Sequence, residues 1–237
     1  MESPEPPFTI RLTTLPPVPC PYLPGRVETV RAILASTIDG GTYRAFLDAN
    51  FRRSGRMIYQ PVCDGCSECK QIRIPTWTFE PSTSQRRTKR RNEALTVSID
   101  KPVLTDEKFD LYARYVRDWH GKEDEADAER LRSFLYDAPL QALEFCYRDE
   151  AGKLLAVGLC DVMPDVLSSV YFYFDPAEAK RGLGTYGAIY EIEWAARNGF
   201  TYYYPGYYIR DCPAMSYKAN FRPAEVLESE NVWRILP

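Results

Sequence analysis

The order of predicted secondary-structure elements in the carboxy-terminal half constrains the fold more than any other feature of this 237-residue sequence. Two amphipathic helices come first, then three strands, a helix and a last strand, at residues 106–120, 126–137, 142–148, 153–162, 167–174, 184–198 and 200–204. Gly199 is expected to end the last helix, and Pro205-Gly206 to form a loop after the last strand. This order predicts a mixed α/β (α+β) fold.

The amino-terminal half is predicted to form a smaller domain of its own. Residues 1–20 are rich in proline and are expected to be extended. Beyond them the pattern predicts a helix, a strand, a second helix and a second strand, at 42–51, 72–79, 85–95 and 95–100. Lys101-Pro102 ends the last of these strands, so we place the domain boundary there. The chain is then divided into 1–101 and 102–237.

Positive charge is concentrated in one stretch of an otherwise acidic chain. Residues 52–91 hold ten Lys or Arg and three Asp or Glu, a local balance of +7, so the remaining residues carry −10 to give the total of −3. Charge separated in this way indicates a face that binds a polyanion. Nucleic acid is the first partner to consider.

The seven cysteines are odd in number and unevenly spaced, which argues against a secreted disulfide framework. No apolar run approaches the ~20 residues that span a membrane, and the proline-rich start does not look like a signal peptide. We therefore expect a protein of the reducing cytoplasm, with no membrane partner. Cys63, Cys66 and Cys69, with Cys20 as a fourth ligand, are spaced to hold zinc or an iron–sulfur cluster. Reduced cysteines that only pack the domain are the alternative.

A glycine-containing turn precedes the predicted helix at 184–198. Lys180, Arg181, Gly182 and Gly184 follow the third strand, and free backbone amides at a helix start favour an anionic or carbonyl oxygen. The turn resembles the one with which the Gcn5-related N-acetyltransferase fold holds the pyrophosphate of coenzyme A. That pattern usually begins with Gln or Arg, where this chain has Ala179. The resemblance therefore favours this fold more than it favours coenzyme A as the ligand.

Three longer motifs are spread over about residues 20–230. The first is Phe51-Arg52-Arg53-Ser54-Gly55 with Tyr59-Gln60-Pro61-Val62-Cys63, and the second is Ser84-Gln85-Arg86-Arg87 with Arg90-Arg91-Asn92. The third comprises Tyr204-Pro205-Gly206-Tyr207-Tyr208-Ile209, Cys212, Met215, Tyr217-Lys218, Phe221, Pro223 and Glu225. Together they resemble the signatures of the arginyl-tRNA–protein transferases.

Within that family the chain is similar to the compact bacterial branch, the aspartate/glutamate leucyltransferases. The resemblance implies transfer of Leu from leucyl-tRNA to proteins that begin with Asp or Glu, which marks them for degradation through the N-degron pathway. Pro205, Tyr208 and Ala214 depart from the usual third motif. Transfer of Arg by the same mechanism is therefore the alternative.

The implied reaction assigns roles to groups of residues. Contacts to tRNA are expected from Arg86, Arg87, Lys89, Arg90 and Arg91, and from the turn formed by Lys180, Arg181, Gly182 and Gly184. The acceptor carboxylate needs a cation, for which the candidates are Arg52, Arg53, Arg73, Arg222 and Lys218. We favour Lys218 and Arg222, because they follow the loop after the core strand, where the resembled fold has its reaction centre. Lys218, Tyr207 and Tyr217 are the candidate catalytic residues, and tyrosines there could stack on the terminal adenosine or donate to the oxyanion. Surface ion pairs and core packing are the structural alternatives.

The aminoacyl ester is already activated, so the resemblance implies no required cofactor and no Ser-His-Asp arrangement. This fits a chain with one histidine, His120, to which we assign no catalytic role. Two other functions remain open. An acetyl-CoA-dependent N-acetyltransferase would share the fold but leaves the arginine-rich half without a role. A non-enzymatic RNA-binding module leaves residues 140–225 unexplained.

Overall fold

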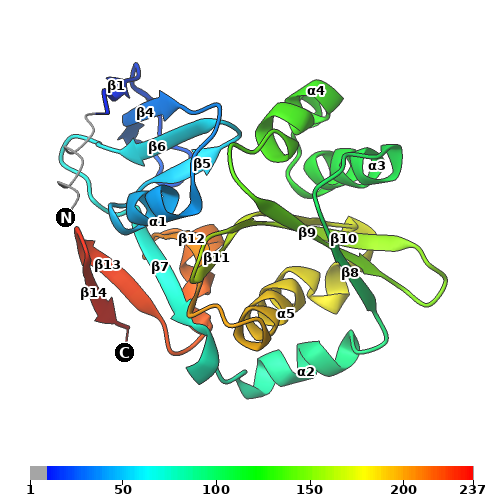
Figure 1. The fold of residues 1–237 in the computed structure, drawn as a ribbon. Coiled ribbons are helices and arrows are strands. Elements are labelled where there is room, and N and C mark those ends of the chain that lie inside the picture. Colours follow the sequence, from blue (N-terminus) through cyan, green and yellow to red (C-terminus); the bar gives the residue numbers. More distant parts are fainter. Residues whose placement is uncertain (1–9, 237) are drawn as a thin grey trace, which may run out of the picture.

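An eight-stranded mixed sheet forms the centre of the computed structural model, which describes residues 10–236 (Figure 1). Its strand order is β14-β13-β7-β12-β11-β10-β9-β8. The bounds are β7 Lys70–Pro75, β8 Thr96–Asp100, β9 Ala142–Arg148, β10 Leu154–Val162, β11 Val166–Phe174, β12 Tyr202–Tyr208, β13 Glu225–Ser229 and β14 Val232–Ile235. The predicted mixed α/β class is confirmed.

Helices cover both faces of this sheet. Helices α2 (Thr83–Arg91) and α5 (Leu183–Arg197) lie on one side, and α3 (Asp106–Arg114) and α4 (Ala128–Leu131) lie on the other (Figure 1). Phe145 and Tyr147 of β9 pack in the α5 core cluster, whereas Cys146 between them packs in the α3 cluster, as strand alternation requires. Short helical turns complete this part, at Thr76–Thr78, Tyr115–Trp119, Glu123–Glu125, Arg132–Tyr136, Pro176–Arg181, Pro213–Ser216 (α6) and Tyr217–Asn220.

The amino-terminal region adds a four-stranded antiparallel sheet in the order β1-β4-β6-β5. Its strands, a separate two-stranded pair and the first helix have the bounds β1 Thr13–Thr14, β4 Val30–Leu34, β5 Arg52–Ser54, β6 Met57–Pro61, β2 Val18–Pro19, β3 Val27–Glu28 and α1 Gly40–Asp48. Tyr43 and Leu47 of α1 are fully buried against Val166 and Tyr204 of the large sheet. Helix α1 therefore joins the two sheets.

The order helix, helix, strand, strand, strand, helix, strand is confirmed in the carboxy-terminal half. One detail was wrong, because Pro205-Gly206 is not a loop and β12 continues to Tyr208. The strand absorbs these residues by a register shift between Tyr203 and Gly206 against β7. Gly206 allows the shift because its φ is +103°, a value that side-chain-bearing residues rarely adopt.

The amino-terminal elements are found close to their predicted places, with shifted ends. The first predicted helix is α1, which ends at Asp48, and the strand predicted at 72–79 runs from Lys70 to Pro75. The helix predicted at 85–95 is α2, which Ser82 caps in a capping box with Gln85. Residues 1–9 of the predicted extended segment lie outside the described residues.

The predicted division after residue 101 falls inside the large sheet. Strand β7 pairs with β12 and β13, and β8 pairs with β9, so two strands that precede the boundary hydrogen-bond to strands that follow it. The rest of the amino-terminal region, including the small sheet, stays outside the large sheet. No helix among residues 10–236 is both long and apolar enough to cross a membrane.

Two neighbouring strands separate at the centre of the sheet. Strands β11 and β12 run parallel and pair only from Val166–Tyr202 to Ser168–Tyr204. Beyond Ser168, β11 also changes register against β10 between Leu159 and Cys160. Pairing therefore stops beyond Ser168 and Tyr204, which leaves an opening in the hydrogen-bond ladder between β11 and β12, and bulges of this kind are common beside active sites.

A buried ion pair holds the small sheet against the large one beside this opening. Arg53 of β5 donates from Nε and Nη2 to the two carboxylate oxygens of Asp161 of β10, at 2.7 and 2.6 Å. Both side chains are 1% exposed. The bidentate geometry compensates for the cost of removing the two charges from water.

We expect Asp161→Asn to lower the free energy of unfolding by about 3–5 kcal/mol, because it leaves the Arg53 charge buried without a partner. The double variant Arg53→Met/Asp161→Leu should lose less than this single variant. Urea unfolding measures both. The control is Glu107→Gln, which breaks the exposed bidentate pair with Arg148 and should cost below about 1 kcal/mol. Equal losses in Asp161→Asn and Glu107→Gln would contradict this account.

Candidate active site

Arg52 reaches into the opening between β11 and β12. It precedes Arg53 on β5, so strand alternation directs its side chain to the opposite face from the Asp161 pair. Its Nη1 donates to Oγ of Ser168 at 2.7 Å and its Nη2 donates to the carbonyl oxygen of Ser169 at 2.5 Å. Only 7% of Arg52 is exposed. A buried guanidinium is therefore held at the point where the two strands separate.

Lys218 is the second buried cation at this point. It lies on the turn Tyr217–Asn220, is 7% exposed, and donates from Nζ to the carbonyl oxygen of Tyr207 at 2.8 Å. A Cβ atom placed on Gly206 would lie 3.3 Å from Nζ of Lys218 and 3.6 Å from Nη2 of Arg52. Both cations thus lie directly beside Gly206, where even a Cβ atom would be a tight fit.

The two cations act on each other. Burial, and then the charge of Arg52, lowers the pKa of Lys218 to about 7. Within residues 10–236, neither Arg52 nor Lys218 forms an ion pair with a carboxylate. Two buried positive charges without an anionic partner are costly, and a bound carboxylate would relieve that cost. This arrangement can bind an acidic group.

Aromatic rings and thiols line the space around the cations. Tyr22, Tyr59 and Tyr207 are each close enough to Arg52 for its charge to oppose the burial that raises their pKa values. The hydroxyl of Tyr207 donates to the carbonyl oxygen of Asn50 at 3.0 Å. In this arrangement the hydroxyl is engaged by a backbone carbonyl, and the catalytic role of Tyr207 stays a prediction.

Arg53 and Arg73, two predicted carboxylate-binding residues, have internal partners instead. Arg53 forms its buried ion pair with Asp161. Arg73 donates from Nε to Glu225 at 2.6 Å, and its guanidinium lies 3.9 Å from the ring centres of both Tyr202 and Trp233. Because their guanidinium groups are already engaged by carboxylates, the structure favours a structural role for both residues, and carboxylate binding by them stays a prediction.

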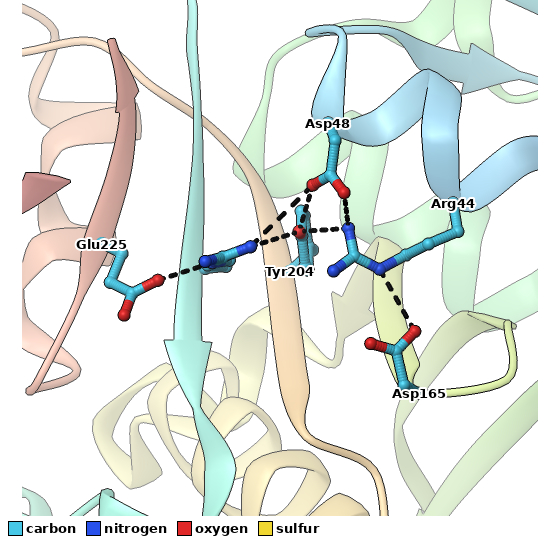
Figure 2. A network of polar contacts seen from close by, with 6 residues as sticks. Arg44, Asp48, Asp165, Tyr204 and Glu225 are labelled. Atoms are coloured by element: carbon cyan, nitrogen blue, oxygen red, sulfur yellow. Dashed lines mark hydrogen bonds and ion pairs between the residues drawn. The ribbon is translucent and has the colours of Figure 1, made fainter. Parts of the chain in front are cut away.

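Arg73 belongs to a network that joins α1 to three strands of the large sheet and to Asp165 in the turn between β10 and β11 (Figure 2). The hydroxyl of Tyr204 is its hub, since it donates to Asp48 Oδ1 at 2.7 Å and accepts from Arg44 Nη1 at 2.8 Å. Arg44 also pairs with Asp48, and with Asp165 at 3.2 Å. The network connects α1, β12, β7 and β13, so Tyr204 has a structural role and is not available for stacking.

Tyr217 lies on a different surface, a groove of about 540 Å³. Tyr217 is about half exposed there, and its ring contacts Phe221 edge-on at 6.5 Å. The groove is lined by residues of α2, of the α5 start and of the turn after α6, namely Ser82, Ser84, Gln85, Thr88, Thr185, Tyr217, Asn220, Phe221 and Arg222. The structure therefore places Arg222 beside α2, whereas Tyr217 lines the α2 groove and is also close enough to the buried Glu191, and to Tyr115 on the α3 side, for an electrostatic influence between these groups.

The basic residues of α2 are exposed and lie beside the glycine turn. Arg91 donates to the carbonyl oxygen of Lys180 at 2.6 Å, and Asn92 donates to that of Arg181 at 2.9 Å. A Cβ atom on Gly182 would lie 3.3 Å from Thr88, whereas one on Gly184 would meet no atom within 4 Å. All members of the predicted cluster are exposed, namely Arg86, Arg87, Lys89, Arg90 and Arg91. The α2 cluster and the turn thus form one continuous surface.

The cysteines of the amino-terminal region lie near one another. Burial raises the pKa of Cys69 to about 12, with further contributions from Cys63, Cys20 and Cys66. All four side chains are partly buried and carry free thiols. Among residues 10–236, however, no three or more His, Cys, Asp or Glu side chains are arranged to hold a metal ion.

The sequence did not indicate several residues that shape the opening. Ser168 and Ser169 interrupt an otherwise apolar strand, and that interruption was the available signal. Glu191 is an acid on the buried face of α5, where Tyr203 donates to it at 2.6 Å and burial raises its pKa to about 7. Cys69 was considered only as a metal ligand, although it also lies close enough to Lys218 to influence its pKa.

Comparisons with protein families and curated proteins agree over most of the chain. The family described as "Arginine-tRNA-protein transferase, N terminus" matches residues 18–87, and "Arginine-tRNA-protein transferase, C terminus" matches residues 107–228. An aspartate/glutamate leucyltransferase of Saccharophagus degradans is 38% identical over 229 residues, which are 94% of this chain and 96% of that protein. Another, from Hahella chejuensis, is 38% identical over 222 residues and covers 92% and 94%.

A solved structure provides a similarity of fold. The crystal structure of FemX superposes with a TM-score of 0.51 over 82% of this chain and 68% of that chain. The sequence identity is 10%. At this identity the similarity concerns the arrangement of the elements alone.

The two buried lysines of the chain provide a test of the site. Lys218 and Lys108 are each 7% exposed, but Lys108 pairs with Glu144 whereas Lys218 has no carboxylate. We expect Lys218→Met to raise the free energy of unfolding by about 2 kcal/mol at pH 6, and Lys108→Met to lower it by about 3–5 kcal/mol.

The pH dependence of Lys218→Met has a definite sign. The folded pKa of Lys218, about 7, lies below its ordinary value of 10.5, so the cost of burying the charge is full below pH 7 and is relieved as pH rises toward 10.5. The stability gain should therefore shrink over that range. Urea unfolding at pH 6 and pH 9 measures it. A Lys218→Met protein that is less stable than wild type at pH 6 would show that Lys218 supports the fold.

Proposed function

The chain belongs to the arginine-tRNA-protein transferase family and is a transferase, and we propose that it moves leucine from leucyl-tRNA to the amino-terminal Asp or Glu of proteins. Product proteins would then carry an amino-terminal Leu, which marks them for degradation. The leucine donor and acidic acceptor are those in the names of relatives with 38% identity. The physical argument for the acceptor comes from the opening between β11 and β12.

One observation carries the proposal: two buried cations at the reaction centre lack an anionic partner. Arg52 and Lys218 lie on either side of the position that a Cβ atom on Gly206 would take. An acceptor that begins with Asp or Glu has a carboxylate on its first side chain, and that carboxylate would complete the charge pairing. A neutral first residue would leave both cations unpaired as they are in the free protein, so its binding would lack the several kcal/mol that the charge pairing contributes for an acidic residue. Selectivity for acidic acceptors follows.

The bound carboxylate would also decide the protonation state of Lys218. A negative charge beside Nζ raises the lysine pKa above its value of about 7 in the free site, so Lys218 is charged in the complex. The acceptor carboxylate is then fixed between a guanidinium and an ammonium group. The adjacent α-amine, with a pKa of about 7.7–8.0, is held close to the ester and has a usable neutral fraction near pH 7.

The chemical step exchanges an ester for an amide. The nitrogen of the neutral α-amine bonds to the carbonyl carbon of leucyl-tRNA, and the carbon–oxygen bond to the terminal ribose breaks. The proton released by the amine goes to the departing ribose oxygen. No redox change or external activation is needed, because the ester is already activated. The chain contributes position and electrostatics, and fixed positioning alone can supply much of the rate.

The α2 side of the molecule suits the tRNA. The exposed cations of α2 and the adjacent turn at Lys180–Gly184 form a basic surface that can contact phosphates. The groove beside it contains the half-exposed Tyr217 ring, on which a base of the unpaired 3′ end could stack. Tyr217, which lines the groove, directly precedes Lys218, so a 3′ end that lies in the groove is directed toward the two cations.

We propose that residues 102–237 have the Gcn5-related acyltransferase architecture, supported by the separating parallel strands β11 and β12 and the fold similarity to FemX. The amino-terminal region that contains the cysteines would then be added to this acyltransferase domain and would contribute Arg52 to the reaction centre. All seven cysteines are free, which suits the reducing cytoplasm that we propose as its location.

Incubation of the protein with charged tRNA and synthetic peptides tests the proposed activity. We expect leucyl-tRNA to give peptides heavier by one leucyl residue when they begin with Asp or Glu, and at least about 100-fold less product when they begin with Ala, since the unpaired cations cost several kcal/mol. Mass spectrometry of the peptides measures this. Transfer of Arg from arginyl-tRNA instead would identify the alternative donor, and no transfer from either charged tRNA would refute the proposed function.

A second expectation concerns the basic surface on α2. The variant Arg87→Gln/Arg90→Gln should weaken tRNA binding and reduce the slope of log affinity against log salt by about 2, because two phosphate contacts are lost. Filter binding over a salt series measures the slope. Arg130→Gln/Arg132→Gln provides the control, since these arginines are exposed near α4, at the opposite end of the molecule from α2 (Figure 1). Equal slopes in the two double variants would exclude α2 as the tRNA surface.

We also propose that Cys20, Cys63, Cys66 and Cys69 take up one zinc ion or an iron–sulfur cluster. Four thiols are a suitable donor set, and the effect of the other three on Cys69 places them near one another. Their described arrangement does not form a metal site, so uptake would require the side chains to move. Metal analysis of protein purified without oxygen should find about one equivalent per chain. Less than about a tenth of an equivalent would contradict this proposal.

A further inference from the structure

A second groove lies beside the cysteine loop. It has a volume of about 480 Å³ and is formed by the cysteine loop, by residues next to β5 and β6, and by the β13–β14 hairpin. It opens where the pairing between β7 and β13 stops, since these strands pair only at Arg73–Glu225 and Ile72–Val226. Lys70 and residues 227–230 therefore diverge and form two of its walls.

This groove ends at the wall of the cation site. Asn50 lines the groove, and its carbonyl oxygen accepts from the hydroxyl of Tyr207 at 3.0 Å. The carbonyl oxygen of Tyr207 in turn accepts from Nζ of Lys218 at 2.8 Å, and Asn50 and Phe51 directly precede Arg52. A chain lying in the groove thus adjoins the residues that hold both cations.

The two grooves approach Lys218 from different directions. The α2 groove is lined by Tyr217 and Asn220, the neighbours of Lys218 on the same helical turn. The second groove is lined by Cys69 and Lys70, and no residue lines both. Transfer between two large substrates requires that donor and acceptor reach the same point without occupying the same path.

The charges of the second groove distinguish between these substrates. Its lining includes three carboxylates and two cations, namely Glu68, Glu228, Glu230, Arg31 and Lys70. Carboxylates repel a phosphate backbone, whereas the α2 groove has Arg222 and the adjacent basic cluster. Mixed charges and polar side chains such as Gln60 and Ser67 suit a polypeptide of varied sequence.

We infer that the groove lined by the Cys63–Lys70 loop and residues 227–230 binds the acceptor polypeptide just beyond its amino-terminal acidic residue. This inference rests on the proposed function. It assigns the first residue to Arg52 and Lys218, and the next few residues to the groove, whose volume lies in the range of ligand-binding pockets. Recognition then has two parts, a specific carboxylate contact and a tolerant groove.

Acceptor peptides of increasing length test the inference. We compare an Asp-starting dipeptide with a hexapeptide that begins with the same two residues. The KM of the wild-type protein should be about tenfold lower for the hexapeptide, and kcat should change little, because the added residues contribute only to binding. The same KM for both lengths would overturn the inference. No transfer to any Asp-starting peptide would instead be a failure of the proposed function.

Filling either groove gives a matched comparison. Ser67 is exposed on the cysteine loop and Ser84 is exposed on α2, so Trp at each site places a large ring in one groove. Ser67→Trp should raise the KM of the hexapeptide to that of the dipeptide and leave the dipeptide KM unchanged. Ser84→Trp should leave the KM of the hexapeptide about tenfold below that of the dipeptide and raise the KM for leucyl-tRNA. The opposite pattern would overturn the inference.

A cross-linking measurement keeps the test independent of these variants. An Asp-starting hexapeptide with a benzophenone side chain at its fourth residue is irradiated with the wild-type protein, and the adduct is located by mass spectrometry. Adducts within 63–70 or 227–230 would support the inference. Adducts within 82–88 or 217–222 would place the acceptor in the α2 groove and overturn it.

Discussion

The buried pair between Arg53 and Asp161 is the contact on which the active site depends most. It fixes β5 of the small sheet against β10 of the large one with both charges almost fully buried. Because neighbouring strand residues point to opposite faces, fixing Arg53 also fixes the direction of Arg52. Arg52 then occupies the opening between β11 and β12, where its partners are a hydroxyl and a carbonyl oxygen. A structural charge pair thus positions a functional charge.

The chain treats its buried charges in two ways. Arg53, Arg73 and Lys108 have carboxylate partners, as folded proteins usually require, whereas Arg52 and Lys218 have none among the described residues. The unpaired cations lower the stability of the free protein but are already in place when an acidic acceptor arrives. Little reorganisation is then needed at the moment of binding, which favours both affinity and selectivity. This trade between stability and function is common at active sites.

Local patterns in the sequence predicted much of the fold but less of the site. Periodicity, Ser82 as a cap and Gly199 as a helix end located the elements well, because these signals act within a few residues. The path through Pro205-Gly206 was wrong because pairing with β7 decides it. Lys218 was favoured from the sequence, but so was Arg222, whereas Arg52 was not. Only tertiary contacts separate Arg52 from Arg53 and Arg73, whose partners Asp161 and Glu225 are more than 100 residues away in the chain.

The central claim is that Lys218, together with Arg52, binds the acceptor carboxylate. A comparison of kcat/KM for two peptides in two proteins tests it directly. Peptides beginning with Asp and with Asn are compared in the wild-type protein and in Lys218→Met. We expect kcat/KM of the wild type to favour Asp by about 100-fold, and Lys218→Met to lose most of that preference while its rate on the Asn peptide changes little. An equal loss of activity on both peptides would contradict the claim, because it would show that Lys218 does not distinguish the carboxylate.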